Sequence, residues 1–307
     1  MNGPSDSLDT AALKALARPS DTRGLMQLAG HLGLLALTGT GVLLALGSWW
    51  LIAALPAHGL VLIFLFAPLH ETIHRTAFRT RPLNDTVAGL CGFLLLLPPR
   101  WFRAFHLAHH RFTRDPARDP ELAEPEVTSR LAYLRHVSGL PTWTRQLELL
   151  VRQAAGIVDS PFVPARETRA VTTEARVFLV SYAAIFGFSI IAGSTLALWL
   201  WIVPALLGQP ILRLFLLAEH HGCPRGPTML DNTRTTASNR LVRFLSWNMP
   251  YHAEHHAYPA LPFHALPAAH ARLGPRIAVR APGYAAVQRD IWRRLSRSES
   301  QKQAITV

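Results

Sequence analysis

Long apolar runs alternate with polar segments along this chain of 307 residues. Four runs carry almost no acidic or basic side chain, and each is close to the roughly 20 residues that a helix needs to cross a bilayer. They span residues 25–46, 51–69, 177–193 and 196–218. The pattern therefore predicts an integral membrane protein with four transmembrane helices. The alternative is a soluble protein with four buried helices, but such helices are usually shorter and amphipathic.

The positively charged residues predict how these helices are oriented. Residues 47–50 join the first two runs and contain no Lys or Arg, and the turn near Ser194 also has none. Most Arg residues lie in segment 75–176 and in the tail after Arg213. Because Lys and Arg collect on the cytoplasmic side of a membrane, we expect two hairpins whose tips face outward. Both termini and the middle segment would then be cytoplasmic.

The remaining segments predict a cytoplasmic cap of short helices, so that the whole fold is all-α. An apolar stretch at residues 87–99 is too short to cross the membrane, and we interpret it as a re-entrant or interfacial helix. Residues 102–112 follow as a helix, whereas segment 222–239 is rich in Gly, Pro, Thr and Asn, which is typical of a loop. We divide the chain into an N-terminal cytoplasmic arm, a membrane domain and a basic C-terminal tail, at residues 1–24, 25–275 and 276–307.

Histidine residues recur at spacings of three or four in three clusters. The clusters are His70 and His74; His106, His109 and His110; and His252, His255 and His256. On a helix, side chains at these spacings share one face. His220 ends the fourth apolar run, and all nine histidines fall on the same predicted side of the membrane. Since apolar length and Arg placement predict that topology without reference to His, the shared side independently supports a common site.

Converging histidines indicate a metal site, because neutral imidazole binds iron, zinc and copper well. Nine nitrogens exceed what one ion takes, and two ions with four or five ligands each fit better. A hydrolytic zinc usually has three protein ligands. An all-His pair of ions suits iron, because oxygen activation requires a change of redox state. A metal transporter would place its ligands inside the spans, near the bilayer centre, and a scaffold would not need nine converging imidazoles.

Side chains close to these histidines in sequence are candidates for supporting or extending the ligand set. A carboxylate commonly orients the imidazole of a metal-bound histidine. The acidic candidates are Glu71, Glu219, Glu254 and Asp231, with Asp115 also nearby. Asn248 lies four residues before His252 and can bind a metal directly or through water. His221 lies about 100° from His220 around a helix, so we expect it to point elsewhere.

The other histidines and the overall charge predict packing and surface roles. His31 and His58 fall in the first hairpin, where we expect packing or interfacial positions. We expect surface positions for His136, His264 and His270, and a place in the lining of the site is the alternative for His264 and His270. The net charge of +12 favours anionic lipid headgroups and an acidic redox partner. No interleaving of aromatic and basic residues indicates a nucleic-acid partner, and two Cys are too few for a disulfide framework.

The order of the motifs, HxxxH, HxxHH, a single His and HxxHH, resembles the membrane fatty acid desaturase and hydroxylase superfamily. The resemblance covers residues 25–275, and segments 218–220, 232–236 and 247–256 are similar to a bacterial desaturase-like branch. It implies four spans forming a stalk beneath a cytoplasmic cap that holds two irons, in a bacterial inner membrane. It also implies that all nine histidines are ligands. Some members place an Asn ligand where this chain has Leu216, so a nine-histidine set fits better.

The resemblance further implies oxygen-dependent attack on an unactivated C–H bond. O2 is then a co-substrate, and electrons arrive singly from a separate donor such as ferredoxin, rubredoxin or cytochrome b5. A fused donor would carry a heme-binding His-Pro-Gly-Gly motif, which this sequence does not contain. We therefore expect a desaturase that introduces a double bond into a fatty acyl or lipid chain. A hydroxylase acting on a lipid-like or small amphiphilic substrate is the alternative, because the ligands do not separate the two reactions.

Overall fold

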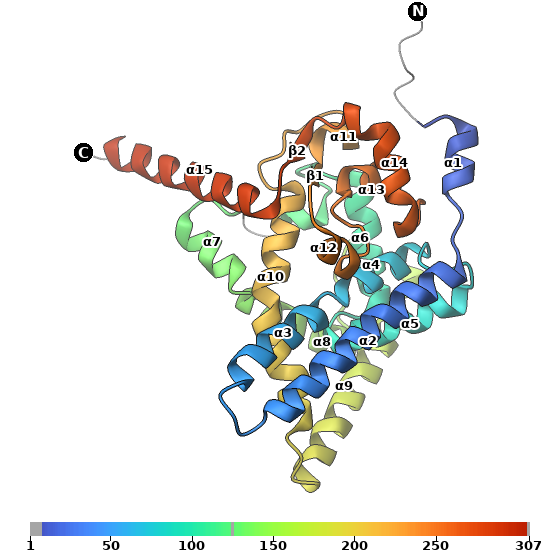
Figure 1. Ribbon diagram of the computed structural model, residues 1–307, viewed down its shortest axis with the longest axis vertical. Helices are drawn as coiled ribbons and strands as arrows, with labels where there is room; N and C mark the ends of the chain where they lie inside the picture. The colour runs from blue at the N-terminus through green and yellow to red at the C-terminus, as the bar shows by residue number, and fades with distance from the viewer. Residues whose placement is uncertain (1–7, 124–125, 306–307) are drawn as a thin grey trace, which may run out of the picture.

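The computed structural model describes residues 8–123 and 126–305, and these residues are mostly helical (Figure 1). Five helices come from the long apolar stretches of the sequence: α2 (Asp21–Ala45), α3 (Leu51–Ile63), α4 (Phe66–His74), α9 (Thr168–Ile191) and α10 (Val203–His220). The others are α1 (Thr10–Leu16), α5 (Arg81–Leu94), α6 (Pro99–Phe112), α7 (Arg130–Val137), α8 (Leu140–Ala154), α11 (Met229–Asn232), α12 (Arg240–Leu245), α13 (His252–Ala257), α14 (Leu266–Leu273) and α15 (Tyr284–Ile305). Helix α15 projects from the body as an arm (Figure 1).

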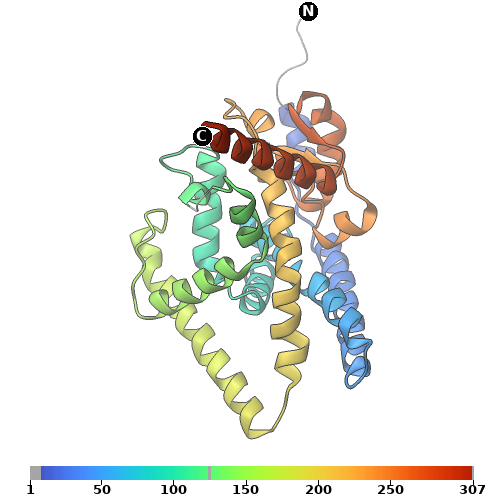
Figure 2. The same ribbon diagram turned by 90° about the vertical axis from the view of Figure 1, so that its left-hand side faces the viewer.

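Four helical stretches within the described residues are long and apolar enough to cross a membrane. They are Asp21–Ala45, Leu51–His74, Ala165–Ile191 and Leu198–His220. They lie in the lower part of the molecule in Figures 1 and 2. Their outer surfaces carry large apolar side chains, and Leu44 and Ile191 are 82% and 87% exposed. Such a surface is suited to lipid and not to water. The prediction of four long apolar helices is confirmed.

Two glycines bring α3 and α10 into backbone contact. A Cβ atom at Gly59 would lie 2.3 Å from the carbonyl oxygen of Pro204, and one at Gly208 would lie 2.2 Å from the carbonyl oxygen of Gly59. Only a residue without a side chain fits at either position, and small residues commonly allow membrane helices to approach this closely. Helix α10 therefore packs along α3, whereas Figure 2 shows α9 diverging from α10 beyond the turn that joins them.

A break at residues 64 and 65 separates α4 from α3. In a continuous helix the ring of Pro68 would clash with the carbonyl group of Phe64, and Pro68 has no amide hydrogen to donate to it. The chain instead makes a tighter turn in which the amide of Ala67 donates to the Phe64 carbonyl at 2.9 Å. Helix α4 begins after this turn, and its following residues include His70 and His74.

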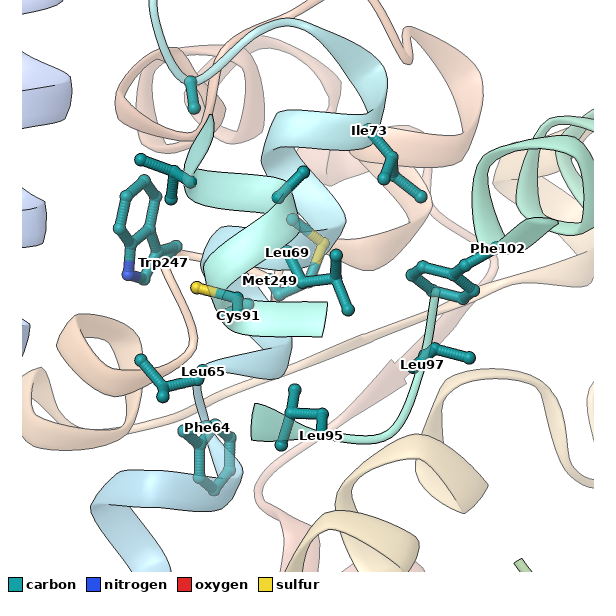
Figure 3. Close-up of a cluster of buried hydrophobic side chains, with 14 of the residues drawn as sticks. Phe64, Leu65, Leu69, Ile73, Cys91, Leu95, Leu97, Phe102, Trp247 and Met249 are labelled. Carbon is teal, nitrogen blue, oxygen red and sulfur yellow. The ribbon is translucent and has the colours of Figure 1, made fainter. Parts of the chain in front are cut away.

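A buried apolar layer joins the elements that carry the histidines (Figure 3). Leu69 and Ile73 of α4 pack with Phe102 of α6 and with Met249 and Trp247, which precede α13. Trp247 is fully buried, and at φ 49° its backbone lies in the left-handed region. The layer holds α4, α6 and the segment leading into α13 in one core. It therefore fixes the relative positions of three histidine-bearing helices.

Two short strands correct the all-α expectation. Strand β1 (Arg234–Thr236) pairs in parallel with β2 (Val279–Ala281), with Thr235 opposite Arg280. The guanidinium group of Arg234 donates to the carbonyl oxygens of Ala218 and His221, which ties β1 to the end of α10. Segment 222–239, expected to be a loop, thus contains α11 and β1. Strand β1 forms because it pairs with β2, which is distant in sequence, and the local amino-acid composition does not predict such pairing.

Candidate metal centre

The structure brings all nine clustered histidines together inside the cap. In the first group, ligand nitrogens of five residues lie within 4.8 Å of one another: His70, His74, His106, His110 and His255. In the second group, the same limit joins His109, His220 and His256. His252 completes this second group, because its Nε2 lies 3.1 Å from Nε2 of His220. Two adjacent groups, and not a single one, are the arrangement expected for two ions.

Each group draws on helices that are distant in sequence. Helix α4 provides His70 and His74, α6 provides the middle cluster, the end of α10 provides His220, and α13 provides the last cluster. Nitrogens from different elements approach closely: Nε2 of His255 lies 3.1 Å from Nε2 of His110. The Nε2 atoms of His109 and His220 are 3.2 Å apart. Two ligands about 2.1 Å from one ion at a right angle lie about 3 Å apart, so these spacings fit shared metal ions.

Several buried imidazole nitrogens have no hydrogen-bond partner within the described part of the chain. They include both nitrogens of His70 and the Nε2 atoms of His74 and His256. A buried polar atom without a partner destabilises a fold by about 1–3 kcal/mol. So many in one place indicate that the groups are shaped for cations. The clusters therefore fit a metal site.

Burial and mutual repulsion keep most of these histidines neutral. Burial lowers the pKa of His106, His110 and the three α13 histidines well below the ordinary value, and neighbouring imidazoles lower it further. Neutral imidazole is the form that binds a metal. His109 differs: burial lowers its pKa, but Glu121 and Asp119 outweigh burial and raise it above the ordinary value.

Asp119 is the carboxylate that contacts the centre most directly. Its Oδ1 lies 2.9 Å from Nδ1 of His109, and Glu121 approaches the same nitrogen at 3.3 Å. The backbone amides of Arg114 and Glu121 donate to Asp119 and hold it in place. The sequence reasoning missed Asp119 and considered Asp115, which pairs with Arg118 at the surface. The sequence did contain a signal for Asp119: it lies in the Pro-containing turn that directly follows the second histidine cluster.

Of the residues predicted to support the histidines, one contacts the nine histidines and the others do not. Glu219 reaches the centre, with Oε1 3.4 Å from Nδ1 of His252. Glu71 accepts from the Thr76 hydroxyl and the Phe263 amide, and Glu254 accepts from Thr235 and pairs with His270. Asn248 donates to the Phe263 carbonyl, and Asp231 closes a capping box with Thr228. Four of the five therefore support the surrounding fold through contacts outside the nine histidines.

The histidines outside the two groups are more buried, and make more contacts, than the sequence suggested. His31 and His58 are buried and bind backbone carbonyls of Val61 and Leu200, which agrees with the expected packing role. His136, His264 and His270, expected at the surface, are instead partly buried. Arg23 donates to His264, and His136 lines a cavity. His221 is half-buried, and its carbonyl accepts from Arg234.

A cavity of about 640 Å³ lies directly beside the histidines. His70, His106, His109, His220 and His252 form part of its wall. Aromatic and aliphatic side chains form much of the rest, including Phe66, Trp101, Phe102, Leu212 and Met249. Its volume is typical of a pocket that encloses a small organic ligand. An apolar substrate chain placed there would lie against both groups of imidazoles.

The model of the fatty acid desaturase family matches residues 23–288. The chain belongs to the fatty acid desaturase family. It is 26% identical to sphingolipid delta(4)-desaturase DES1 of Drosophila melanogaster over 72% of this chain and 65% of that protein. It is 27% identical to dihydrorhizobitoxine desaturase of Bradyrhizobium elkanii over 88% of this chain and 79% of that protein. Sphingolipid delta(4)-desaturase of Komagataella phaffii is 26% identical over 66% of this chain and 55% of that protein.

The family confirms the resemblance seen in the sequence, and it makes the four apolar helices those of an integral membrane enzyme. The matches span less than two thirds of the length of both sphingolipid desaturases. Family membership and the two groups of histidines both fit a metal site. The matched residues include the cavity lining and all nine histidines.

Proposed function

We propose that this protein is an oxygen-dependent diiron desaturase that introduces a double bond into a fatty acyl or lipid chain. One observation carries the proposal: two adjacent groups of imidazoles contribute to the wall of a largely apolar cavity in a desaturase-family chain. A hydrolytic zinc site needs neither this many nitrogens nor such a cavity.

The nine histidines divide naturally between two irons. His70, His74, His106, His110 and His255 would hold one ion, and His109, His220, His252 and His256 the other. When bound, iron supplies the change of redox state that oxygen-dependent removal of hydrogen from an unactivated C–H bond requires. Asp119 and Glu219 would orient His109 and His252 from the side away from the ions.

The protein's own part in the reaction is to position the chain and exclude water. Phe66, Phe102 and Leu212 line the cavity next to His70 and His106. They would hold an apolar chain against the centre and limit its movement. Desaturation and hydroxylation begin with the same removal of hydrogen, so the outcome depends on substrate pose within about an ångström.

The same proposal includes the membrane arrangement. Four spans would form two hairpins, with the metal centre in a cytoplasmic cap and both termini in the cytoplasm of a bacterial inner membrane. The excess of Arg in the segments outside the spans supports this orientation. Residues 1–24 would be a cytoplasmic arm, 25–275 the membrane domain and 276–307 a basic tail. A separate donor such as ferredoxin or rubredoxin would deliver electrons.

Mass spectrometry of cells that express this chain with a ferredoxin system tests the proposal. A product lighter than its precursor by two hydrogens is expected, and it should be absent from a matched strain carrying His255→Ala. A product heavier than its precursor by one oxygen would show that the protein is the alternative hydroxylase and not a desaturase. If the two strains contain the same lipids and small metabolites, the proposed reaction is wrong for the substrates of that host.

A further inference from the structure

Helix α8 connects the two later membrane-spanning helices. It packs against α9, and the residue before its start lies against α10. Figure 2 shows that α9 diverges from α10 beyond the turn that joins them. At its 15 residues α8 is about 22 Å long, so it reaches from one span to the other where the two stand apart.

The end of α8 lies level with the start of the apolar part of α9. Nε of Arg176 donates to the carbonyl oxygen of Ala154, the last residue of α8, at 2.8 Å. Arg176 is the last charged residue before the apolar run 177–193. An arginine at the end of a span keeps its guanidinium group at the polar boundary of the bilayer. This contact therefore marks the depth of the C-terminal end of α8.

The beginning of α8 lies close to the corresponding boundary on α10. A Cβ atom at Gly139, which directly precedes α8, would lie 2.3 Å from Cγ of Gln209. Gln209 lies about one helical turn, or about 6 Å, before Arg213. Arg213 is the first charged residue after the turn that joins the two spans. The N-terminal end of α8 is thus slightly on the apolar side of this boundary.

The two boundaries lie at a similar depth. Apolar runs 177–193 and 196–212 are equally long and lead away from the same turn, one to Arg176 and the other to Arg213. Since both runs are helical, equal lengths cover equal distances along the helices. Helix α8 therefore lies across the two spans at the level where each meets its first charged side chain.

One flank of α8 exposes a row of apolar side chains. Leu140, Leu147 and Val151 are 63%, 51% and 50% exposed. With the exposed Thr144 they follow the spacing i, i+4, i+7 and i+11, which places all four along one side of the helix. We call these four residues the α8 stripe. A contiguous exposed apolar surface of this kind marks contact with another protein or with a membrane.

The opposite flank of α8 faces the cavity. Thr142 and Leu149 line the cavity beside the histidines, and Leu150 is fully buried against the protein. At 100° per residue, Thr142 and Leu149 lie about half a turn from the α8 stripe, with Leu150 between the two flanks. The helix therefore separates the cavity from whatever covers the stripe.

The α8 stripe continues the lipid-facing surface of α9. Val177 and Val180 directly follow Arg176 along this span and are 56% and 68% exposed. Val151 lies one turn before Ala154, which Arg176 contacts. The exposed apolar residues of the two helices thus meet at this contact. Lipid that covers the upper part of α9 also reaches the stripe.

We infer that α8 lies in the boundary layer of the bilayer and binds lipid through the α8 stripe. Helices of this kind place their apolar side about 5–10 Å into the boundary between headgroups and acyl chains. Glu148 and Arg152, whose side chains are exposed, then lie among the headgroups. The cavity lies about one helix diameter, roughly 10 Å, from lipid. The inference requires that α9 and α10 cross a membrane, and it does not depend on the proposed reaction.

Spin labels on the full-length protein in phosphatidylcholine nanodiscs test the inference. A nitroxide is attached at Leu147→Cys, Val151→Cys or Glu148→Cys, and both native cysteines are buried. Power saturation measures collisions with O2, which concentrates in lipid, and with a nickel chelate, which stays in water. The labels at 147 and 151 should give a higher ratio of O2 to nickel collisions than the label at 148.

Two further labels set the scale of this ratio. Val180→Cys on α9 gives the value for lipid, and Ala117→Cys, exposed on the cap, gives the value for water. The labels on the α8 stripe should fall closer to the lipid value. Nickel access equal to that at Ala117→Cys would place the stripe in water and overturn the inference. Protection from both reagents would show that protein covers the stripe, which would overturn it as well.

Photocrosslinking in membranes provides a second measurement that uses no cysteine. With p-benzoylphenylalanine in place of Leu147, the protein should crosslink to radiolabelled phosphatidylcholine. Leu131 is the matched control, because it is 76% exposed but lies on α7 beside α15, away from the spans. Equal lipid labelling from Leu147 and Leu131 would contradict the inference. Labelling from Val180 without labelling from Leu147 would contradict it too.

Discussion

His109 and Asp119 form a buried pair in which Nδ1 lies 2.9 Å from Oδ1, with 3% and 1% of the two side chains exposed. The pair links α6 to the turn that follows it. The carboxylate leaves Nε2 of His109 directed at His220, 3.2 Å away. Asp119 therefore sets both the orientation and the tautomer of one imidazole in the second group.

Replacing Asp119 by Asn should lower iron affinity or product formation by about 10- to 100-fold, the usual effect of removing such a partner. Iron content by atomic emission and product yield by mass spectrometry would measure it. Asp115→Asn is the control, since Asp115 pairs with Arg118 at the surface. Equal losses in the two variants would show that the turn, and not the His109 contact, is what matters.

Removing one histidine from either group should lower the iron content of the protein. His255→Ala in the first group and His220→Ala in the second should each lower iron per chain by about half or more and abolish product. His221→Ala is a matched control for iron content, because His221 adjoins His220 but lies outside both groups. If His221→Ala loses as much iron as His220→Ala, the assignment of ligands on α10 is wrong.

Contact between α3 and α10 should not tolerate a side chain at Gly208. A Cβ atom there would lie 2.2 Å from the Gly59 carbonyl oxygen, so Gly208→Ala should destabilise the fold by roughly 1–3 kcal/mol through overpacking. Gly187→Ala on α9 is the control, because nothing lies within 4 Å of a Cβ atom at that position. Thermal unfolding in detergent compares the two, and equal midpoints would contradict the predicted close crossing.

His264 should make stability depend on pH. Burial, together with the nearby charge of Arg23, lowers the pKa of His264 to about 4, while the unfolded value is 6.5. Between these values the unfolded chain binds more protons, so stability falls as pH decreases from 6.5 toward 4. The side chain is only partly buried, which limits the contribution to about 1 kcal/mol or less. His264→Gln should flatten the slope of the unfolding midpoint against pH, and parallel slopes would refute this role.

The proposed orientation predicts which cysteines a membrane-impermeant maleimide reaches. Both native cysteines are buried, which keeps background labelling low. Ser48→Cys, at an exposed hairpin tip, should react in intact cells, whereas Ala117→Cys, exposed in the cap, should react only after permeabilisation. The reverse pattern would place the metal centre outside the cytoplasm.

The sequence by itself determined the class of this protein and the local content of its metal centre. Apolar run length alone identifies four membrane-spanning helices, because crossing hydrocarbon requires about 20 apolar residues whatever the tertiary fold. The spacing of His70 and His74, or of His106, His109 and His110, assigns each cluster to one helical face, because residues three or four apart are neighbours on the same helix. The order of these clusters was enough to identify the family.

Tertiary structure decided how the histidines divide between two groups and which carboxylates support them. Nε2 of His110 lies 3.1 Å from Nε2 of His255, which is 145 residues away in the sequence, and periodicity within a helix carries no information on such pairs. Glu254 adjoins His255 in sequence yet pairs with His270, because neighbours on a helix face different directions. Asp119 reaches His109 only because a turn folds back after α6. The pairing of β1 with β2 likewise depends on contacts between distant segments.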